Sequence, residues 1–595
     1  MLKFRGICVS AVIAVGVIPA TAQAPFGGFS PGNLVVSRSV YQGTASTVTV
    51  GQALPPSCPA GNKSCTTASV NGSYPGVWAN EGPDASFGVT SPIFLDQLTT
   101  GGVLVNTLAV DPTQLITSFS SKSEVALNLS TDGTKVTFMG YTSSTPSSPG
   151  VNALDVSNSN TPLVLDTTNP VGTSFNRAVA QVDATGNLQV TLGNAYSGNN
   201  GRAAILANGT YYTVGNSNNG SGTPANVVAA GGVQFLTPSA LSLANQGQGA
   251  SVNKVGSFSV TQYGFTADKA GKDDNFRGLT IFNNTLYITK GSGSNGINTV
   301  YQVGSSGSLP TTGTSWPITI LNGFPATLAK NAGPQSDFPF GVWFANANTL
   351  YVADEGDGTP ADAAGSTQAG LQKWVFNGTT WQLAYVLQKG LNLGQAYSVP
   401  GYPTALNPAT DGLRNLTGRW NADGTATIWA VTSTVSANVD EGADPNLLVM
   451  ITDVVDNTNA AAAAGEQFSV VKAAGFGEVL RGVSFTPGTL ANPAPPSLPV
   501  TSSALAYSRA TRTFNGTVTL TNNTGSAVTG PYSVELTNLP AGVTLTNGVI
   551  INTLPAVQLV ATGATLNPGQ SATTAISFSD PSMTTITFTP IVVQQ

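Results

Sequence analysis

The sequence predicts an all-β protein, and three observations carry that prediction. The chain is rich in Thr, Val, Ser, Gly and Asn, whereas charged residues make up only 8% of its 595 residues. These residue types favour strands and turns, and the spacing typical of long helices is missing. Asn-Gly and Asp-Gly pairs recur between short strand-like runs, as they do in β-hairpins. A five-residue phrase also recurs, which indicates a repeat architecture.

The strand-like runs predict a series of hairpins. Asp132-Gly133 and Asn208-Gly209 are two of the turns that join such runs. The predicted hairpins are residues 124–129 with 135–141, 203–207 with 210–214, 279–282 with 285–289, and 341–345 with 349–353.

The recurring phrase predicts one equivalent strand in each hairpin unit. It reads Phe276-Arg277-Gly278-Leu279-Thr280, Leu413-Arg414-Asn415-Leu416-Thr417 and Leu480-Arg481-Gly482-Val483-Ser484, with a weaker copy at Gly201-Arg202-Ala203-Ala204-Ile205. The unit is ~70 residues long, which fits a four-stranded propeller blade with long loops. Another unit begins at Phe338-Pro339-Phe340-Gly341-Val342.

These copies predict a β-propeller of about six blades over residues 25–490. Its inner strands begin near residues 124, 202, 277, 340, 414 and 481. The last inner strand has no outer strands after it, and residues 33–40, 92–98 and 103–108 supply the missing ones. N- and C-terminal strands are therefore expected to share a blade, which would remove exposed sheet edges.

A second domain is expected at the C-terminus. Residues 491–501 are rich in proline and read as a stiff linker. Residues 502–595 alternate as strands do, and their length fits a seven-stranded immunoglobulin-like sandwich. The Cys-Trp-Cys signature of antibody domains is missing.

The first 24 residues read as a signal peptide, so the protein is expected to be secreted or at the cell surface. Lys3 and Arg5 precede an apolar stretch that is too short to span a bilayer, and Ala20-Thr21-Ala22 fits a cleavage site. No later stretch predicts a membrane span. Cys58 and Cys65 lie in one exported loop and are expected to form a local disulfide; a metal-thiolate pair would need two further ligands.

Composition excludes several functions. The chain has no histidine, which removes Ser-His-Asp and Cys-His catalysis and histidine-ligated metals. Its formal net charge is −6, with only 22 Lys and Arg residues, so nucleic acid is not an expected partner. Any catalysis would have to use carboxylates, Tyr, Lys, Arg or a hard metal ion.

Four segments resemble those of uncharacterised secreted bacterial β-propellers that carry a C-terminal immunoglobulin-like module. They are Gly32-Asn33-Leu34-Val35-Val36, Ser91-Pro92-Ile93-Phe94-Leu95-Asp96, Thr349-Leu350-Tyr351-Val352-Ala353-Asp354 and the Leu-Arg-x-Leu-Thr phrase. The resemblance covers most of residues 30–490. It implies a propeller at the bacterial exterior and carries over no catalytic residue.

The candidate site is the propeller face on which the inner strands begin. Four of the ten arginines are expected to surround the channel mouth there, joined by carboxylates from the loops between second and third strands. The candidate residues are Arg202, Arg277, Arg414, Arg481, Glu81, Asp84, Asp354 and Glu441. They are open to three interpretations: ion pairs that lock neighbouring blades together, a polar funnel for an anionic or sugar-like ligand, or a catalytic carboxylate pair.

The sequence favours a non-enzymatic recognition or scaffold protein that binds a glycan or another surface polymer. The alternative is a carbohydrate-active hydrolase or lyase that uses top-face carboxylates, Tyr141 or an arginine. No cofactor is expected. The acidic run from Asp354 to Gly358 could hold calcium, but it lacks EF-hand spacing and also reads as an ordinary acidic loop.

Overall fold

A computed structural model gives the fold of the chain. It describes residues 26–41, 53–54, 66–67, 90–119, 121–122, 124–143, 175–193, 195–196, 200–216, 232–238, 273–311, 316–421, 424–437, 442–489, 498–523, 527–551 and 554–594. The predicted all-β class is confirmed. Helical structure in these ranges is limited to four single turns: η1 (Ala329–Asn331), α2 (Pro360–Ala363), η2 (Thr404–Leu406) and α3 (Ala460–Ala463). None of these helices has the length and hydropathy needed to cross a bilayer.

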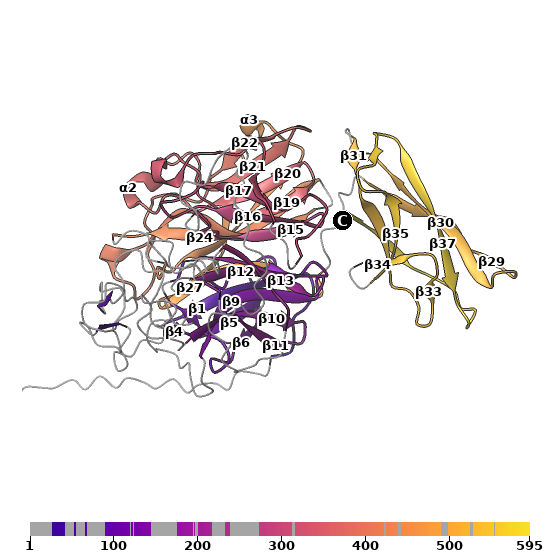
Figure 1. Cartoon of the computed structure of the whole chain (residues 1–595), viewed down its shortest axis with the longest axis horizontal. Helices are drawn as coiled ribbons and strands as arrows, with labels where there is room; N and C mark the ends of the chain where they lie inside the picture. The colour runs from indigo at the N-terminus through magenta and orange to yellow at the C-terminus, as the bar shows by residue number, and fades with distance from the viewer. Residues whose placement is uncertain are drawn as a thin grey trace, which may run out of the picture.

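Six antiparallel sheets occupy residues 34–485 (Figure 1). We number them in chain order, beginning with the sheet that contains the N-terminal strand β1. The first strand of a sheet is the strand named first below, which in sheet 1 is β27. Sheet 1 contains β27 (Glu478–Phe485), β1 (Leu34–Val40), β5 (Ile93–Leu98) and β6 (Leu104–Ala109). Sheet 2 contains β8 (Asn128–Leu129), β9 (Lys135–Ser143), β10 (Phe175–Asp183) and β11 (Leu188–Gly193). Sheet 3 contains β12 (Gly201–Ala207), β13 (Thr210–Gly215) and β14 (Gly232–Leu236).

The other three sheets each follow the chain order strand by strand. Sheet 4 contains β15 (Leu279–Phe282), β16 (Thr285–Lys290), β17 (Thr299–Val303) and β18 (Ile318–Ile320). Sheet 5 contains β19 (Pro339–Asn346), β20 (Thr349–Asp354), β21 (Gly370–Phe376) and β22 (Trp381–Leu387). Sheet 6 contains β23 (Ala409–Trp420), β24 (Thr425–Val435), β25 (Leu447–Val454) and β26 (Ser469–Ala473). Two further pairs are β2 (Ala53–Leu54) with β3 (Thr66–Thr67) and β4 (Thr90–Ser91) with β7 (Thr117–Ser118).

Sheet 1 joins the two ends of this region. Strand β1 pairs with β27 on one side and with β5 on the other, so three strands from the N-terminal part of the chain share a sheet with β27 from residues 478–485. The first strand of every sheet contacts the first strand of the next, and β27 contacts both β23 and β8. The six first strands therefore lie together, with the outer strands of each sheet directed away from them (Figure 1).

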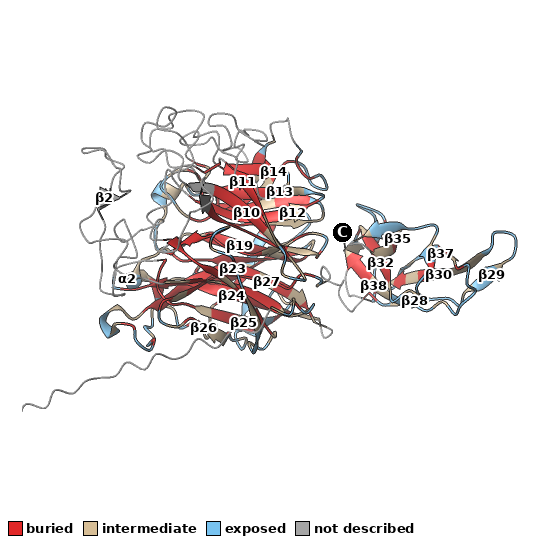
Figure 2. Cartoon of the chain, turned by 90° about the horizontal axis from the view of Figure 1, so that it is seen from below, coloured by how far each residue is buried: buried red, intermediate tan, exposed pale blue. Residues whose placement is uncertain are grey.

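Apolar side chains fill the space between consecutive sheets. Separate buried clusters lie between sheets 1 and 2, between sheets 2 and 3, across sheets 3 to 5, between sheets 5 and 6, and between sheets 6 and 1. Figure 2 shows this burial along most strands of the six sheets. Burial of each Leu, Ile, Val or Phe side chain stabilises the fold by about 1.5–3 kcal/mol, so these layers are the main favourable term.

Glycines allow the first strands to approach one another. A Cβ atom at Gly278 would overlap the carbonyl oxygen of Phe340, and one at Gly341 would overlap that of Arg414. A Cβ at Gly482 would lie 2.5 Å from the Leu127 nitrogen. Glycine is therefore required at these three positions, where one first strand meets the backbone of the next.

Second-strand hydroxyls reinforce the same contacts. Ser37, Thr137 and Thr289 each lie on the second strand of a sheet, and each donates to a carbonyl on or beside the first strand of the following sheet. The acceptors are Val125 at 2.6 Å, Ala204 at 2.7 Å and Phe340 at 2.6 Å, respectively.

Residues 498–594 form a two-sheet body (yellow in Figure 1) with its own apolar core. One sheet has β28 (Val500–Ser502), β30 (Thr513–Thr521), β37 (Ser571–Ser579) and β33 (Thr544–Leu545), with β29 (Ala506–Ser508) paired to β30. The other has β34 (Val549–Ile551), β35 (Leu554–Val560), β32 (Tyr532–Thr537) and β38 (Thr589–Gln594); β31 (Val528–Thr529) pairs with β36 (Thr565–Leu566). Strand β28 begins inside the expected linker, because Leu498 and Val500 already pack on this core.

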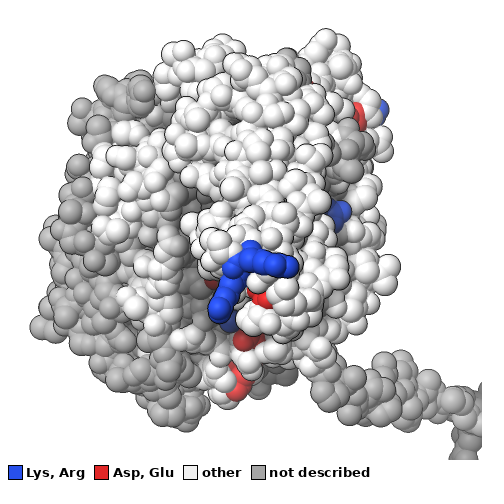
Figure 3. All heavy atoms as spheres, turned by 90° about the vertical axis from the view of Figure 1, so that its right-hand side faces the viewer, with Lys and Arg blue, Asp and Glu red and all other residues white. Residues whose placement is uncertain are grey.

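Figure 3 looks onto this end of the molecule, where charged side chains are sparse.

A buried polar cluster lies between sheets 5 and 6. The Lys373 ammonium donates to Asp453 Oδ2 at 2.7 Å and to the Val454 carbonyl at 2.7 Å, and both side chains of the pair are fully buried. Tyr385 donates to Asp453 Oδ1 at 2.6 Å. The carboxyl of Glu466 also lies against Asp453, and burial together with this contact raises the pKa of Glu466 to about 8. A protonated Glu466 can donate to Asp453, whereas an ionised one repels it.

We predict that E466Q removes a pH dependence of stability. The folded-state pKa of Glu466 lies above its ordinary value of 4.5, so the wild type loses stability as the pH rises from about 4.5 to 8, and the loss is complete above 8. Because Glu466 is partly exposed, we expect an effect of about 1–2 kcal/mol. Urea unfolding at pH 5, 7 and 9 measures it, with D456N as the exposed acidic control. Parallel wild-type and E466Q profiles would contradict the assignment.

We predict that G278A destabilises the fold by at least about 2 kcal/mol, because the new methyl group meets a backbone oxygen that cannot move independently. A Cβ atom at Gly465 would have no other atom within 4 Å, so G465A serves as the matched control. Thermal unfolding compares the two variants. Equal melting temperatures of G278A and G465A would show that the first strands can move apart at position 278 without loss of stability.

Candidate functional site

Six charged side chains, one from each sheet, meet where the first strands begin. We call them the charged ring: Arg481 (sheet 1), Glu124 (sheet 2), Arg202 (sheet 3), Arg277 (sheet 4), Glu355 (sheet 5) and Arg414 (sheet 6). Five lie on or just before a first strand. Glu355 directly follows the second strand of sheet 5, so first strands and second-to-third-strand connections contribute to the same face.

Glu355 links two sheets that are not neighbours. Its Oε2 accepts from Arg414 Nε at 3.0 Å, and its Oε1 lies 3.8 Å from Arg277 Nε. Arg277 belongs to sheet 4 and Arg414 to sheet 6, with sheet 5 between them. The Glu355 carboxylate therefore reaches the region where all the first strands converge, and the side chains of this trio are at most 9% exposed.

Arg481 fastens sheet 1 to its surroundings. Its guanidinium donates to Ser39 Oγ at 2.9 Å, to the Gly442 carbonyl at 2.9 Å, and to the carbonyls of Phe119 and Ser121. It also acts electrostatically on Glu124. One arginine thus joins three segments that are remote in the chain.

Arg202 is the most deeply buried arginine of the ring, at 2% exposure. Its guanidinium donates to Asn275 Oδ1 and, at 3.0 Å, to the Phe276 carbonyl. Burial, followed by the positive charge of Arg277, lowers the pKa of Arg202 well below its ordinary range. Glu355, Tyr141 and Glu124 act on the pKa of Arg202 in the opposite direction.

Glu124 is fully buried, and burial raises its pKa. Its carboxylate accepts from the Tyr141 hydroxyl, from Thr117 Oγ1 at 2.7 Å and from the Ser118 N–H at 3.1 Å. The next residue, Val125, has φ 62°, a conformation that costs a β-branched residue roughly 1–3 kcal/mol. Such strain is concentrated at functional sites, where the surrounding structure holds it.

Arginine dominates the ring: four of its six charged groups are guanidinium groups, and two are carboxylates. Asp354, which precedes Glu355, is not a member of the ring: it accepts from the N–H groups of Phe338 and Gly356 and from Gln372, and burial raises its pKa.

The structure brings together all four predicted arginines. Asp354 is fully buried and bound to its own sheet, and its neighbour Glu355 is the residue that reaches the arginines. Glu81, Asp84 and Glu441 lie outside the described residues, as do Cys58, Cys65 and the expected signal peptide.

Glu124 was missing from the predicted site, and Glu355 was considered only as one carboxylate of the acidic run from Asp354 to Gly358. Glu124 begins a strand-like run and occupies the position at which the recurring phrase carries arginine in its other copies. This glutamate in place of arginine was the sequence signal that could have identified it. In sheet 5, Phe340 stands at the arginine position, and Glu355 supplies the charged group from the connection instead. No local sequence pattern distinguishes Glu355 from Asp354.

The acidic run from Asp354 to Gly358 shows no cation-binding arrangement. Asp354 and Glu355 face different partners, as described above. Within the described ranges, no group of three or more Asp, Glu, His or Cys residues is arranged to hold a metal ion.

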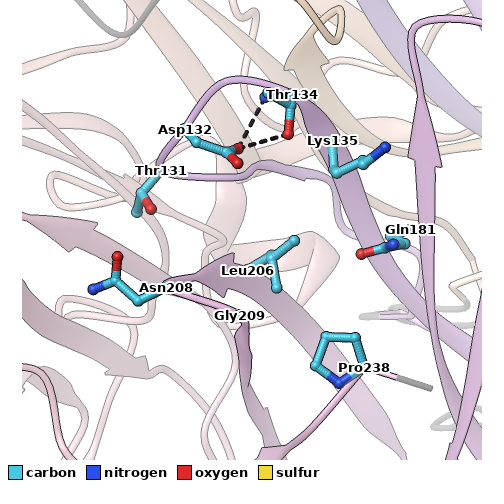
Figure 4. A pocket seen from close by; sticks show the side chains of 9 residues that line it. All are labelled: Thr131, Asp132, Thr134, Lys135, Gln181, Leu206, Asn208, Gly209 and Pro238. Carbon is cyan, nitrogen blue, oxygen red and sulfur yellow. Dashed lines mark hydrogen bonds between the residues drawn. The ribbon is translucent and has the colours of Figure 1, made fainter. Parts of the chain in front are cut away.

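A separate cavity of about 320 Å³ lies at the opposite ends of sheets 2 and 3 (Figure 4). It is lined by the turns of their first hairpins, together with Gln181 and Pro238. The carboxylate of Asp132 in this cavity accepts from Ser130 Oγ and from the N–H and hydroxyl of Thr134. The cavity is therefore distinct from the charged ring.

Comparisons with known proteins leave the family open. No protein-family model matches the chain, and no curated protein matches it significantly. Among solved structures, NanB sialidase from Streptococcus pneumoniae matches with a TM-score of 0.15 and 11% identity over 84% of each chain. A structure titled NanB plus Optactamide matches with the same TM-score and identity over 91% of this chain and 95% of that one. These TM-scores carry no argument about fold or function.

We predict strong coupling between Glu355 and Arg414. Removing one partner of a buried pair leaves an uncompensated charge, so E355Q is expected to cost about 3–5 kcal/mol of stability. The double variant E355Q/R414Q should cost less than the sum of E355Q and R414Q. Urea unfolding of the four proteins measures the coupling, and additive losses would contradict a direct pair.

Proposed function

We propose that residues 34–485 form a six-bladed β-propeller and residues 498–594 an immunoglobulin-like sandwich, in a protein exported to the cell exterior. The contacts between consecutive first strands and the pairing of β27 with β1 support the propeller. The two sheets around one apolar core support the sandwich. The basic, apolar and small-residue order of residues 1–24 supports export.

We further propose that the protein is a non-enzymatic recognition protein whose charged ring binds an anionic group. The single observation that carries this proposal is the convergence of four guanidinium groups in the ring. Guanidinium groups that are at most 7% exposed are costly to bury, and a bound anion would offset part of that cost. The strained Val125 beside Glu124 points to the same place.

The chemistry of the ring favours a carboxylate, such as that of a sugar acid. Guanidinium groups bind carboxylates through paired, charge-assisted hydrogen bonds, and the low exposure of the ring strengthens them. Neutral sugars would gain none of this charge complementarity. The proposed ligand class is therefore an acidic saccharide or another small carboxylate.

One observation favours a second candidate, a carbohydrate-active hydrolase. The Tyr141 hydroxyl donates to Glu124, whose pKa is raised by burial, and raised carboxyl pKa values serve proton transfer. Glu355, by contrast, is held by two arginines, as a structural or binding carboxylate would be. The recognition function therefore has the stronger support.

We predict that the full chain binds glucuronate or galacturonate but not glucose. R202Q removes one guanidinium group of the ring and should weaken binding at least tenfold, a loss of about 1.4 kcal/mol. K389Q removes one exposed positive charge outside the ring and is the charge-matched control. Isothermal titration calorimetry measures binding, and thermal unfolding checks that each variant is folded.

Absence of binding by the folded wild type, or equal binding by R202Q, would sink the proposal and leave the arginines as ties between sheets. Turnover of an aryl glycoside of a sugar acid that is lost in Y141F would favour the hydrolase instead.

A further inference from the structure

The hairpin of β29 and β30 carries the exposed charge of the sandwich. Between residues 498 and 594 the sequence has four charged side chains: Arg509, Arg512, Glu535 and Asp580. Glu535 is fully buried and Asp580 is 4% exposed, whereas both arginines are exposed. Figure 3 shows basic side chains near the centre of this end of the molecule, with a few acidic side chains close to them in the view and mostly uncharged surface around both.

The two arginines stand beside each other. Ser508 pairs with Thr513, so Arg509 and Arg512 are the first and last residues of the four-residue loop between the strands. Like charges at such adjacent positions destabilise a hairpin. Neither arginine forms an ion pair with any described residue, and Thr511 and Thr513 share a hydrogen bond at 2.7 Å in the same loop. The described residues of the hairpin therefore do not offset the two positive charges.

An aromatic pair adjoins the arginines. Tyr507 lies directly opposite Phe514 on the two strands, with ring centroids 5.0 Å apart. Tyr507 is 40% exposed. The loop that carries the two arginines begins two residues after Tyr507, so the tip offers an exposed aromatic ring for the apolar face of a sugar and two cationic groups for its carboxylates.

We propose that this hairpin tip, residues 507–514, is a binding site for a polyanionic polysaccharide with carboxylated sugars. Each arginine alone contributes little at an exposed site, but a polymer presents many equivalent carboxylates, which raises their effective concentration at the tip. A membrane surface is a poorer fit. Lipid-binding elements carry larger basic clusters or insert large apolar residues, whereas this loop contains Ala510 and Thr511 between its arginines.

Retention of the full chain on immobilised polygalacturonate at low salt tests the proposal. R509Q/R512Q should weaken retention at least tenfold, and K330Q/K389Q, which removes two exposed lysines from the six-sheet region, should leave it unchanged. The expected binding falls steeply with added salt.

Three results would overturn the proposal: no retention of the wild type, equal retention of R509Q/R512Q, or equal losses in the lysine control. Preferential binding of the wild type to phosphatidylglycerol vesicles over polygalacturonate would replace the polymer with a membrane. Aggregation of R509Q/R512Q with unchanged polymer binding would instead show that the arginines protect the β29 edge strand from self-association.

Discussion

The close approach of the six first strands is the constraint on which the rest of the structure depends. Each first strand must pass the backbone of the next at a point where a side chain does not fit, and Gly278, Gly341 and Gly482 satisfy that requirement. Where the phrase has Asn415 instead, β23 has an irregular register and the asparagine side chain accepts from the Val483 N–H at 2.7 Å. The apolar layers between sheets then hold the strands in this position.

The same convergence concentrates charge. The residue before Gly278 and the residue before Gly482 are arginines, so strands that meet at their glycines also bring their guanidinium groups to one place. Glu355 lies beside Arg277 and Arg414, and Tyr141, Thr117 and a backbone N–H hold Glu124. The fold thus places four guanidinium groups in a nearly solvent-excluded site, and our proposal that the ring binds an anion starts from that placement.

Much of this arrangement could be predicted from the sequence, because repetition and turn chemistry are local signals. The recurring five-residue phrase identified the four arginines of the charged ring. The turns at Asp132-Gly133 and Asn208-Gly209 identified hairpins of sheets 2 and 3. Glu355 was beyond such reasoning, since only three-dimensional packing separates it from Asp354. The Lys373–Asp453 pair was also unpredictable, because its residues belong to different sheets and are 80 positions apart.

The most direct test of the account is an experimental structure determined from crystals soaked in sodium bromide. We predict an anomalous bromide peak roughly 3–4 Å from guanidinium nitrogens of the charged ring, because an anion bound there would accept charge-assisted hydrogen bonds from them. A ring with no bromide, in a crystal that holds bromide at other surface sites, would contradict it. In that case the four arginines are ties between sheets, and the ligand site lies elsewhere on the protein.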